Sequence, residues 1–385
     1  MGMNVRDQSI LGVAIAGMFA FATAIGIGRF AFTPLLPMMQ KDAGLSLAAA
    51  GWLASANYIG YFIGALSAIW IRTRSAAIVR ASLVTIALLT AAMGASHQPL
   101  AWLMLRALAG IASAWVLVFG SAWVLQRLAE MGSHRLGGVV FAGVGLGIAL
   151  AGGLCLVFLQ LAWSSDSTWI AMGAVALLFT VTSWPGFASA GAGAPAASGA
   201  ATEAPLRSTE HMHLIGSYGC FGFGYIIPAT FLPAMARDVI SDPGIFGWAW
   251  PIFGAAAVIS ALAAGWLSSR LTYRALWIAA HFILAFGVAV PVAWAGMGGI
   301  MLSALCVGST FMVATMAGMQ EARRVAPNNA AGLMAAMTAA FAIGQILGPI
   351  LVSVVSGNPR GMDLALIAAA AALTLGALVL MWQEK

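Results

Sequence analysis

The sequence predicts an all-α membrane protein whose twelve transmembrane helices form two pseudo-symmetric six-helix bundles. Three observations lead to this fold class. Hydrophobic residues make up 62% of the 385 residues and charged residues only 7%, which a water-soluble core of ordinary proportions does not explain. Twelve apolar stretches each approach the roughly 20 residues that a helix needs to cross a bilayer. The second half of the chain also repeats the first.

The repeat has a fixed offset of 196 residues. Residues 26–29 (Gly-Ile-Gly-Arg) return as residues 222–225 (Gly-Phe-Gly-Tyr), and 222 − 26 gives the offset of 196. The pair Gly51-Trp52 returns as Gly247-Trp248. Two parallel repeats related by an axis along the membrane normal enclose a substrate site where they meet. The repeat therefore predicts two equivalent bundles and favours a transporter.

Each apolar stretch is predicted to form one membrane-spanning helix, because a helix satisfies its own backbone hydrogen bonds within the bilayer. The first stretch follows Arg6 but is too long for the apolar region of a cleaved signal peptide, and eleven similar stretches follow it. The predicted spans are residues 10–36, 48–70, 76–95, 99–125, 136–160, 168–186, 212–235, 245–268, 274–295, 298–320, 330–355 and 362–382.

The six spans of each half are predicted to form one bundle, residues 1–186 and residues 210–385. Residues 187–209 between them are rich in Ala, Gly, Ser and Pro and lack an apolar period. This composition predicts a flexible cytoplasmic linker that lets the two bundles move as bodies. The other loops are short, so no soluble sensor or enzymatic domain is expected.

The basic residues predict the orientation of the chain. With twelve spans, the termini and the even-numbered loops lie on one side, where twelve Lys and Arg residues fall, against three on the other side. The positive-inside rule then places both termini in the cytoplasm and makes the chain a multi-pass protein of the bacterial inner membrane. The same distribution explains the net charge of +6 without a nucleic-acid partner.

Metal and cofactor chemistry have no support in the sequence. Cys155, Cys220 and Cys306 lie inside apolar spans without metal-ligand spacing, and the pair His211 and His213 is a poor metal site by itself. No nucleophile or paired-carboxylate arrangement indicates an enzyme. We therefore expect no metal and no cofactor.

Two arginines inside predicted spans are the first candidates for substrate binding, Arg29 in the first span and Arg106 in the fourth. A cation at bilayer depth costs at least about 2.5 kcal/mol, so it should face the bundle interior, a water-filled cavity or an anion. The alternative for each is to snorkel to the periplasmic interface or to bond a neighbouring carbonyl. Arg29 also breaks the repeat, because its counterpart is Tyr225.

Uncharged polar residues inside the spans are further candidates for hydrogen bonds to a solute, although such groups also join helices to one another. They are Asn57, Tyr58, Tyr225, Thr310 and Gln345.

Candidates for proton coupling are few, because none of the eleven acids lies near the middle of a predicted span. Glu321 comes nearest, at the cytoplasmic end of the tenth span, where Arg323 and Arg324 are close enough to pair with it. His281 lies inside the ninth span and could titrate near physiological pH, with packing between helices as its alternative. The candidates are therefore Arg106, His281 and Glu321.

The 45 glycines predict close contacts between helices, because small residues spaced four apart let backbones approach in lipid. Where such spacing recurs at matching places in the two halves, it favours either tight packing or a seam that bends or slides. Proline after the second motif supports the seam, because it kinks a helix. The candidate gating residues are Gly143, Gly147, Gly344, Gly348 and Pro349, together with Arg74 and Arg270 at the cytoplasmic ends of repeated spans.

Residues 26–37 (Gly-Ile-Gly-Arg-Phe-Ala-Phe-Thr-Pro-Leu-Leu-Pro) resemble the first-helix signature of the YbfB/YjiJ-type branch of the major facilitator superfamily. Residues 106–110 (Arg-Ala-Leu-Ala-Gly) resemble the superfamily's fourth-helix Arg-xx-Gln-Gly motif, whose arginine the family associates with proton coupling. The Gly-xxx-Asp-Arg loop signature is degraded, with Ser269 where Asp is typical in the second copy, and Ile148 replaces the proline of the antiporter-associated fifth-helix motif. The resemblance covers the whole chain and implies the major facilitator fold.

Together these features predict a secondary active transporter, not an enzyme, that moves a small organic solute across the inner membrane by alternating access. The preferred substrate is an organic anion held by Arg29 and Arg106. One alternative is a proton-coupled exporter of neutral or lipophilic compounds, and another is a non-transporting membrane scaffold. The predicted partners are the substrate, the lipid bilayer and, as a candidate co-substrate, protons. We expect the monomer to be the functional unit.

Overall fold

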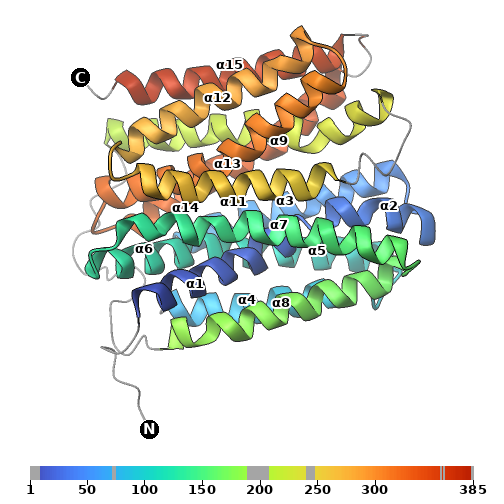
Figure 1. Ribbon diagram of the computed structural model, residues 1–385, viewed down its shortest axis with the longest axis horizontal. Coiled ribbons are helices and arrows are strands. Elements are labelled where there is room, and N and C mark those ends of the chain that lie inside the picture. The colour runs from blue at the N-terminus through green and yellow to red at the C-terminus, as the bar shows by residue number, and fades with distance from the viewer. Residues whose placement is uncertain are drawn as a thin grey trace.

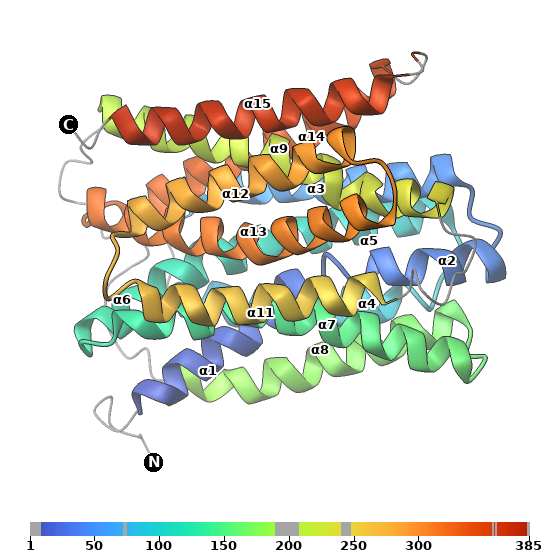
Figure 2. The same ribbon diagram turned by 45° about the horizontal axis from the view of Figure 1, so that its top comes forward.

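The computed structural model describes residues 9–71, 75–188, 208–239, 248–355, 358 and 360–382. Among these residues there is no β-strand, and helices account for nearly all of the chain. The helices run side by side along one direction, with turns and loops at the two ends of the molecule (Figure 1). The rotated view in Figure 2 shows the same arrangement, with the first and last described helices starting and ending at the same end.

The first half of the chain forms six membrane-length segments, and two of these are composite. The first segment contains α1 (Ile10–Phe21), the π-helix η2 (Ala22–Ile27) and α2 (Phe32–Asp42). The fourth contains α5 (Pro99–Trp115), the π-helix η3 (Val116–Gly120) and α6 (Ser121–Glu130). The remaining helices are α3 (Leu47–Ala68), α4 (Ser75–Ala92), the short 3-10 helix η4 (His134–Leu136), α7 (Gly137–Gln160) and α8 (Ser165–Ala188).

Within its described residues, the second half forms six helices, and none of them is interrupted by a π-helical segment. They are α9 (Thr209–Val239), α11 (Ala249–Leu267), α12 (Tyr273–Ala293), α13 (Met297–Val325), α14 (Ala330–Val355) and α15 (Gly361–Met381).

Each of the twelve predicted spans has a helical counterpart. Within the described parts of the chain, ten helical segments are long and apolar enough to cross a membrane. The other two predicted spans correspond to α3 and α9, which are 22 and 31 residues long. Large apolar side chains such as Leu100, Ile259 and Val354 are exposed on the outside of the bundle, where lipid would cover them.

The first span differs from the continuous helix predicted over residues 10–36. Its hydrogen bonds widen to a five-residue spacing, from the Gly28 N–H to the Thr23 carbonyl (2.9 Å) and from the Phe30 N–H to the Ile25 carbonyl (3.2 Å). The chain then turns and restarts as α2, in which Pro34 is the third residue, a position where a missing N–H costs nothing. A π-helical segment followed by a turn is typical of functional sites.

The two halves contact each other along two helix pairs, α7 with α11 and α3 with α14. On α7, glycines at seven-residue intervals (Gly138, Gly145 and Gly152) face α11. A Cβ added at Gly145 would lie 2.6 Å from the carbonyl oxygen of Gly254, so the two backbones meet directly. One apolar core continues through both halves.

The glycines predicted as gating residues lie inside the halves instead of between them. A Cβ on Gly143 would meet the backbone of Met18 in α1, and one on Gly147 would meet η2. Gly344 and Gly348 face α9 in the same way. These glycines bring α7 against the first segment, and α14 against the equivalent α9, at matching places in the repeat.

Candidate functional site

The turn that joins η2 to α2 is held by Arg106 of α5. Nη1 and Nη2 of Arg106 donate to the carbonyl oxygens of Gly28 and Arg29, each at 3.1 Å. Asn57 of α3 donates from Nδ2 to the Arg106 carbonyl at 2.9 Å, and Ser113 of α5 donates to the Ala24 carbonyl at 2.7 Å. The Arg106 and Ser113 donors satisfy carbonyl groups of the distorted first segment, while Asn57 joins α3 to the backbone of α5. Arg106 therefore fixes the backbone from which Arg29 projects.

Arg29 is buried among aromatic rings. Its side chain is only 4% exposed, and its Cζ lies 4.6 Å from the ring centroid of Tyr61, 5.1 Å from that of Tyr58 and 5.4 Å from that of Phe30. Rings within about 6 Å attract a guanidinium group through their negative faces. The Nε and Nη2 atoms of Arg29, however, have no hydrogen-bond partner. These two nitrogens form one edge of the planar guanidinium, so a whole edge of this buried cation is unpaired.

The second half presents an aromatic wall, defined here by Tyr225 of α9, Phe253 of α11, Phe311 of α13 and Phe341 of α14. The Tyr225 ring stacks on Phe311 (centroids 5.8 Å apart, planes at 3°) and on Phe341 (5.7 Å, 15°). Gln345 of α14 donates to the Tyr225 hydroxyl at 3.5 Å, while its Oε1 has no partner.

Phe30 joins the two sides of the site. Its ring lies 6.4 Å from Phe311 and 6.2 Å from Trp250 of α11, edge-on to both. Trp250 stacks on Phe253 at 5.4 Å, and its indole Nε1 has no hydrogen-bond partner. Arg29 and its surrounding rings in the first half therefore lie next to the aromatic wall of the second half, at the interface between the halves.

The residues predicted for substrate binding fall into two groups. Arg29, Asn57, Tyr58 and Arg106 lie together in the first half, and Tyr225 and Gln345 lie together in the second half. Thr310 is different, because its hydroxyl donates to the Cys306 carbonyl of its own helix. That bond satisfies the hydroxyl without a ligand.

Several residues of the site were not predicted from the sequence. Tyr61 lies four residues after Asn57, so the helical period puts both on one face of α3, and this signal was available. Phe30, Trp250 and Phe311 carry no such signal, since aromatic residues in an apolar span occur on every face of a membrane helix.

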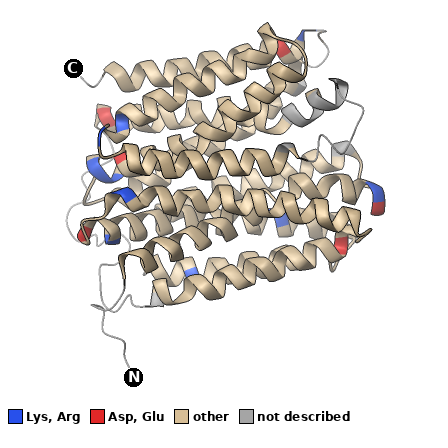
Figure 3. Ribbon diagram, in the orientation of Figure 1, with Lys and Arg blue, Asp and Glu red and all other residues tan. Residues whose placement is uncertain are grey.

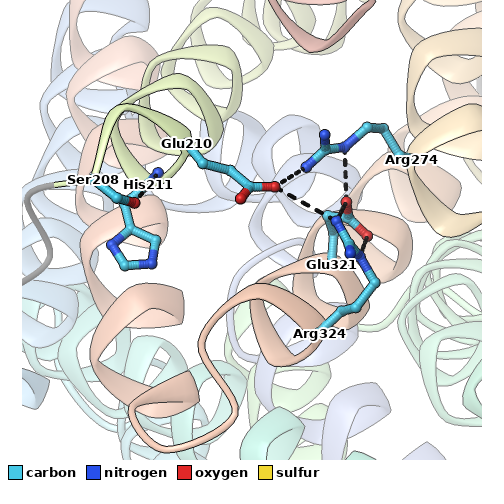
Figure 4. A network of polar contacts seen from close by, with 6 residues as sticks. All are labelled: Ser208, Glu210, His211, Arg274, Glu321 and Arg324. Carbon is cyan, nitrogen blue, oxygen red and sulfur yellow. Dashed lines mark hydrogen bonds and ion pairs between the residues drawn. The ribbon is translucent and has the colours of Figure 1, made fainter. Parts of the chain in front are cut away.

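Glu321 lies in an ion-pair network at one end of the second half (Figure 4). Arg274 of α12 pairs with Glu321 through Nε (2.7 Å) and with Glu210 of α9 through Nη2 (2.6 Å). Arg324 contacts both Glu321 oxygens, at 2.9 Å from Nη2 and 3.0 Å from Nε. Arg274, from another helix, thus takes the place predicted for Arg323. The network ties α9, α12 and α13 together and engages the carboxylate that was a candidate for proton coupling.

His281 is completely buried in α12. Its Nδ1 lies 3.2 Å from the carbonyl oxygen of Trp277, one turn earlier, and its Nε2 lies 3.4 Å from the carbonyl oxygen of Ser217 in α9. The imidazole therefore lies between two acceptors and packs α12 against α9.

Of the two charged gating candidates, Arg270 lies within the described residues. Arg270 is exposed after the end of α11, with its Cζ 4.4 Å from the ring of Trp266. Arg74 lies outside the described residues. Pro349 lies within α14. Most charged residues lie near the ends of the helices, as Figure 3 shows. Arg29 and Arg106, by contrast, are buried inside the bundle.

Comparison with known proteins decides the family. Residues 21–381 match a family described as "Uncharacterised MFS-type transporter YbfB". The chain belongs to this family of major facilitator superfamily transporters. Its fold is similar to that of the transporter FucP in the outward conformation (TM-score 0.74, 14% identity, covering 96% of this chain and 98% of FucP). It is also similar to the E. coli fucose:proton symporter FucP carrying the N162A substitution (TM-score 0.72, 15% identity, covering 97% and 98%). No curated protein matches the chain.

The family match confirms the predicted membership of the YbfB-type branch, and with the structural match it confirms the all-helical major facilitator fold. The protein is accordingly a multi-pass membrane transporter of the secondary type and not an enzyme.

Proposed function

We propose that this transporter moves a small organic anion across the bacterial inner membrane by alternating access, and that Arg29 binds the anionic group. The observation that carries the proposal is the unpaired Nε–Nη2 edge of a cation that is only 4% exposed. A buried ion without a partner costs several kcal/mol, of the order that an incoming anion would recover. No hydrogen-bond partner for this edge exists among the described residues, so the substrate is the natural source of the missing charge.

The same protein supplies a precedent for what such an edge binds. Arg324 holds the two oxygens of Glu321 with its Nε and Nη2 atoms, at 3.0 and 2.9 Å. Arg274 uses the same two atoms for Glu321 and Glu210. This side-on, bidentate contact is among the strongest hydrogen-bonded pairings available to a carboxylate. Arg29 has the same edge without the carboxylate.

Arg106 is proposed to position Arg29 more than to bind the substrate. Both of its Nη atoms are engaged by the carbonyl oxygens of Gly28 and Arg29, which leaves only its Nε unpaired. Asn57 fixes the Arg106 backbone and keeps an unpaired Oδ1. Tyr58 covers one side of Arg29, while Tyr225 and Gln345 are proposed to contact the neutral part of the substrate.

Alternating access requires the halves to rock against each other, and α7 with α11 offers a suitable pivot. The α7 backbone lies directly against the α11 backbone at Gly138 and Gly145, and against the Pro251 ring at Gly152. Such small-residue faces permit close sliding contact in lipid. The glycines inside each half, Gly143 and Gly344 among them, are proposed to keep each bundle rigid while it moves.

Coupling and orientation are proposed from the similarity to FucP and from the charged residues. Similarity to a fucose:proton symporter supports proton coupling, with His281 as the buried titratable candidate that is free of an ion pair. The engagement of Glu321 by two arginines supports exchange or facilitation instead. The excess of basic residues on one side supports cytoplasmic termini. Periplasmic labelling of a cysteine introduced at residue 200 of a cysteine-free variant would contradict that orientation.

The proposal is tested by binding measurements on the purified transporter. A thermal-shift screen of organic anions, neutral sugars and amines identifies a ligand, because a ligand that binds the folded state raises the melting temperature. Calorimetry then compares wild type with Arg29→Ala and Arg29→Lys. We expect Arg29→Ala to weaken anion binding by about 10- to 100-fold, since charged hydrogen bonds contribute about 1.5–3 kcal/mol. Arg29→Lys should recover part of it, because lysine keeps the charge but loses the planar fork.

Arg270→Ala is the matched control, since Arg270 also stacks on an aromatic ring but is exposed. It should leave affinity unchanged. Unchanged affinity in Arg29→Ala would reject the proposal.

A second candidate, the proton-coupled exporter of neutral or lipophilic compounds, is favoured by the aromatic wall alone. It predicts that neutral aromatic compounds bind and that Arg29→Ala leaves their affinity unchanged. Saturable flux of the identified ligand in liposomes separates both transporters from a non-transporting scaffold.

A further inference from the structure

We propose that the anion is a carboxylate borne on a flat, uncharged aromatic body, and that Phe311 selects this body. The inference rests on the proposed function, because the carboxylate is assigned to Arg29. It adds the chemistry of the rest of the substrate, which the anion proposal leaves undefined.

Phe311 is the centre of the aromatic wall. Its ring contacts Phe253 at 5.0 Å, Tyr225 at 5.8 Å and Phe30 at 6.4 Å. Phe253 and Tyr225 belong to the second half, whereas Phe30 belongs to the first and directly follows Arg29 in the chain. Phe311 is thus the wall residue that contacts Phe30, the ring beside the Arg29 guanidinium.

Phe30 is the ring that the ligand would meet between the cation and the wall. It lies 5.4 Å from the Arg29 Cζ and is edge-on to Phe311 and Trp250. Phe30 therefore places an aromatic ring beside the guanidinium to which the carboxylate would bind. Aromatic rings in offset or edge-on contact prefer another aromatic ring to an aliphatic group of equal size.

The wall is also uncharged. At the offset of the repeat, the second half carries Tyr225, Leu302 and Phe253 where the first half carries Arg29, Arg106 and Asn57. Two residues in contact with the wall carry unpaired polar atoms, the Trp250 Nε1 donor and the Gln345 Oε1 acceptor, both neutral. A second charge on the substrate body would be buried here without a partner, which is costly. The two orphans instead suit a neutral substituent such as a hydroxyl group.

The test uses pairs of carboxylates with the same ring skeleton, one member aromatic and flat and the other saturated and puckered. Benzoate is compared with cyclohexanecarboxylate, and 2-naphthoate with its fully saturated analogue, by calorimetry at pH 7.5 on purified full-length protein. All four are monoanions at this pH. We expect the aromatic member to bind about three- to tenfold more tightly, the range expected from one or two aromatic contacts. Phe311→Leu should remove that preference and leave the saturated members unchanged.

Phe141→Leu is the matched control, because Phe141 is equally buried but pairs with Phe21 inside the first half. It should lower the melting temperature as much as Phe311→Leu does and keep the aromatic preference. Equal binding of both members of each pair, or a preference that survives Phe311→Leu, would overturn this inference while leaving the anion proposal intact. If Arg29→Ala leaves binding of every carboxylate unchanged, or none binds, the proposed function itself fails, and this inference fails with it.

Discussion

The first membrane segment and its repeat, α9, show how one ancestral half has acquired two roles. The first segment changes from α-helix to π-helix at Ala22, turns after Gly28 and restarts as α2, whereas α9 continues as one helix of 31 residues over the same part of the repeat. Position 29 in the first copy is arginine, and position 225 in the second is tyrosine. The distorted first segment therefore carries the charged Arg29, and the regular helix α9 carries the aromatic Tyr225 at the same position of the repeat.

The difference has a physical cause that lies outside the segment itself. Opening a helix at bilayer depth leaves carbonyl groups without partners, and each such group costs several kcal/mol in lipid. Arg106 and Ser113 supply the missing donors in the first half. At the 196-residue offset, Leu302 stands where the first half has Arg106 and cannot donate, and α9, the counterpart of the first segment, remains a regular helix. The half that has the distorted helix is therefore also the half that has the hydrogen-bond donors for its free carbonyl groups.

The sharpest way to break this comparison is Arg106→Leu, which gives the first half the residue of the second. The carbonyl oxygens of Gly28 and Arg29 lose their donors, so we expect destabilisation of about 2–6 kcal/mol, from about 1–3 kcal/mol for each of the two unsatisfied buried groups. Ligand binding should fall by at least about tenfold, because Arg29 loses its fixed position. Thermal melting and calorimetry measure the two effects. Wild-type affinity in a stable Arg106→Leu protein would show that Arg106 does not position Arg29.

Glu321→Gln tests the contrast between the two arginine environments. Arg274 and Arg324 have carboxylate partners, whereas Arg29 does not, so removing one charge from the network should affect stability and leave binding alone. We expect about 2–3 kcal/mol of destabilisation, below the range for a fully buried pair because Arg324 is 60% exposed. Melting temperature is the readout, with Glu130→Gln at an exposed pair as the control. Loss of proton-dependent flux without any loss of stability would instead assign Glu321 to coupling.

Much of the fold was predictable from the sequence, because apolar length and the 196-residue repeat depend only on composition along the chain. The candidate site was predictable at Arg29 and Arg106, because a charged residue inside an apolar span is rare. The π-helical segments were not, since Ala22–Ile27 has the composition of an ordinary helix and its distortion depends on donors from α5. The aromatic wall was not predictable either. Phe311 is 1% exposed and Phe286 is 58% exposed, yet both are phenylalanines in apolar spans.

The glycine contacts allow a finer comparison, between packing inside a half and packing between halves. Gly143→Ala places a methyl group against the Met18 backbone in the same half, and Gly145→Ala places one against the Gly254 backbone in the other half. Each should cost about 1–3 kcal/mol as overpacking. Only Gly145→Ala should also change the balance between outward-open and inward-open states. Accessibility of introduced cysteines on the two sides of the membrane measures that balance, and equal effects of both variants would argue against α7 and α11 as the pivot.

The smallest effect is expected when the chain is cut. The bundle boundaries at 186 and 210 remain a prediction, and most of the predicted linker lies outside the described residues. The halves nevertheless contact each other along α7 with α11 and α3 with α14, and one apolar core runs through both. Each half also satisfies its backbone hydrogen bonds within its own helices.

Co-expressed fragments cut after residue 198 should therefore assemble and bind the ligand within about threefold of the intact protein, because the tether contributes only effective concentration. Copurification and calorimetry test this. Fragments that reach the membrane and associate, yet bind nothing, would show that the segment between the halves contributes to the site itself.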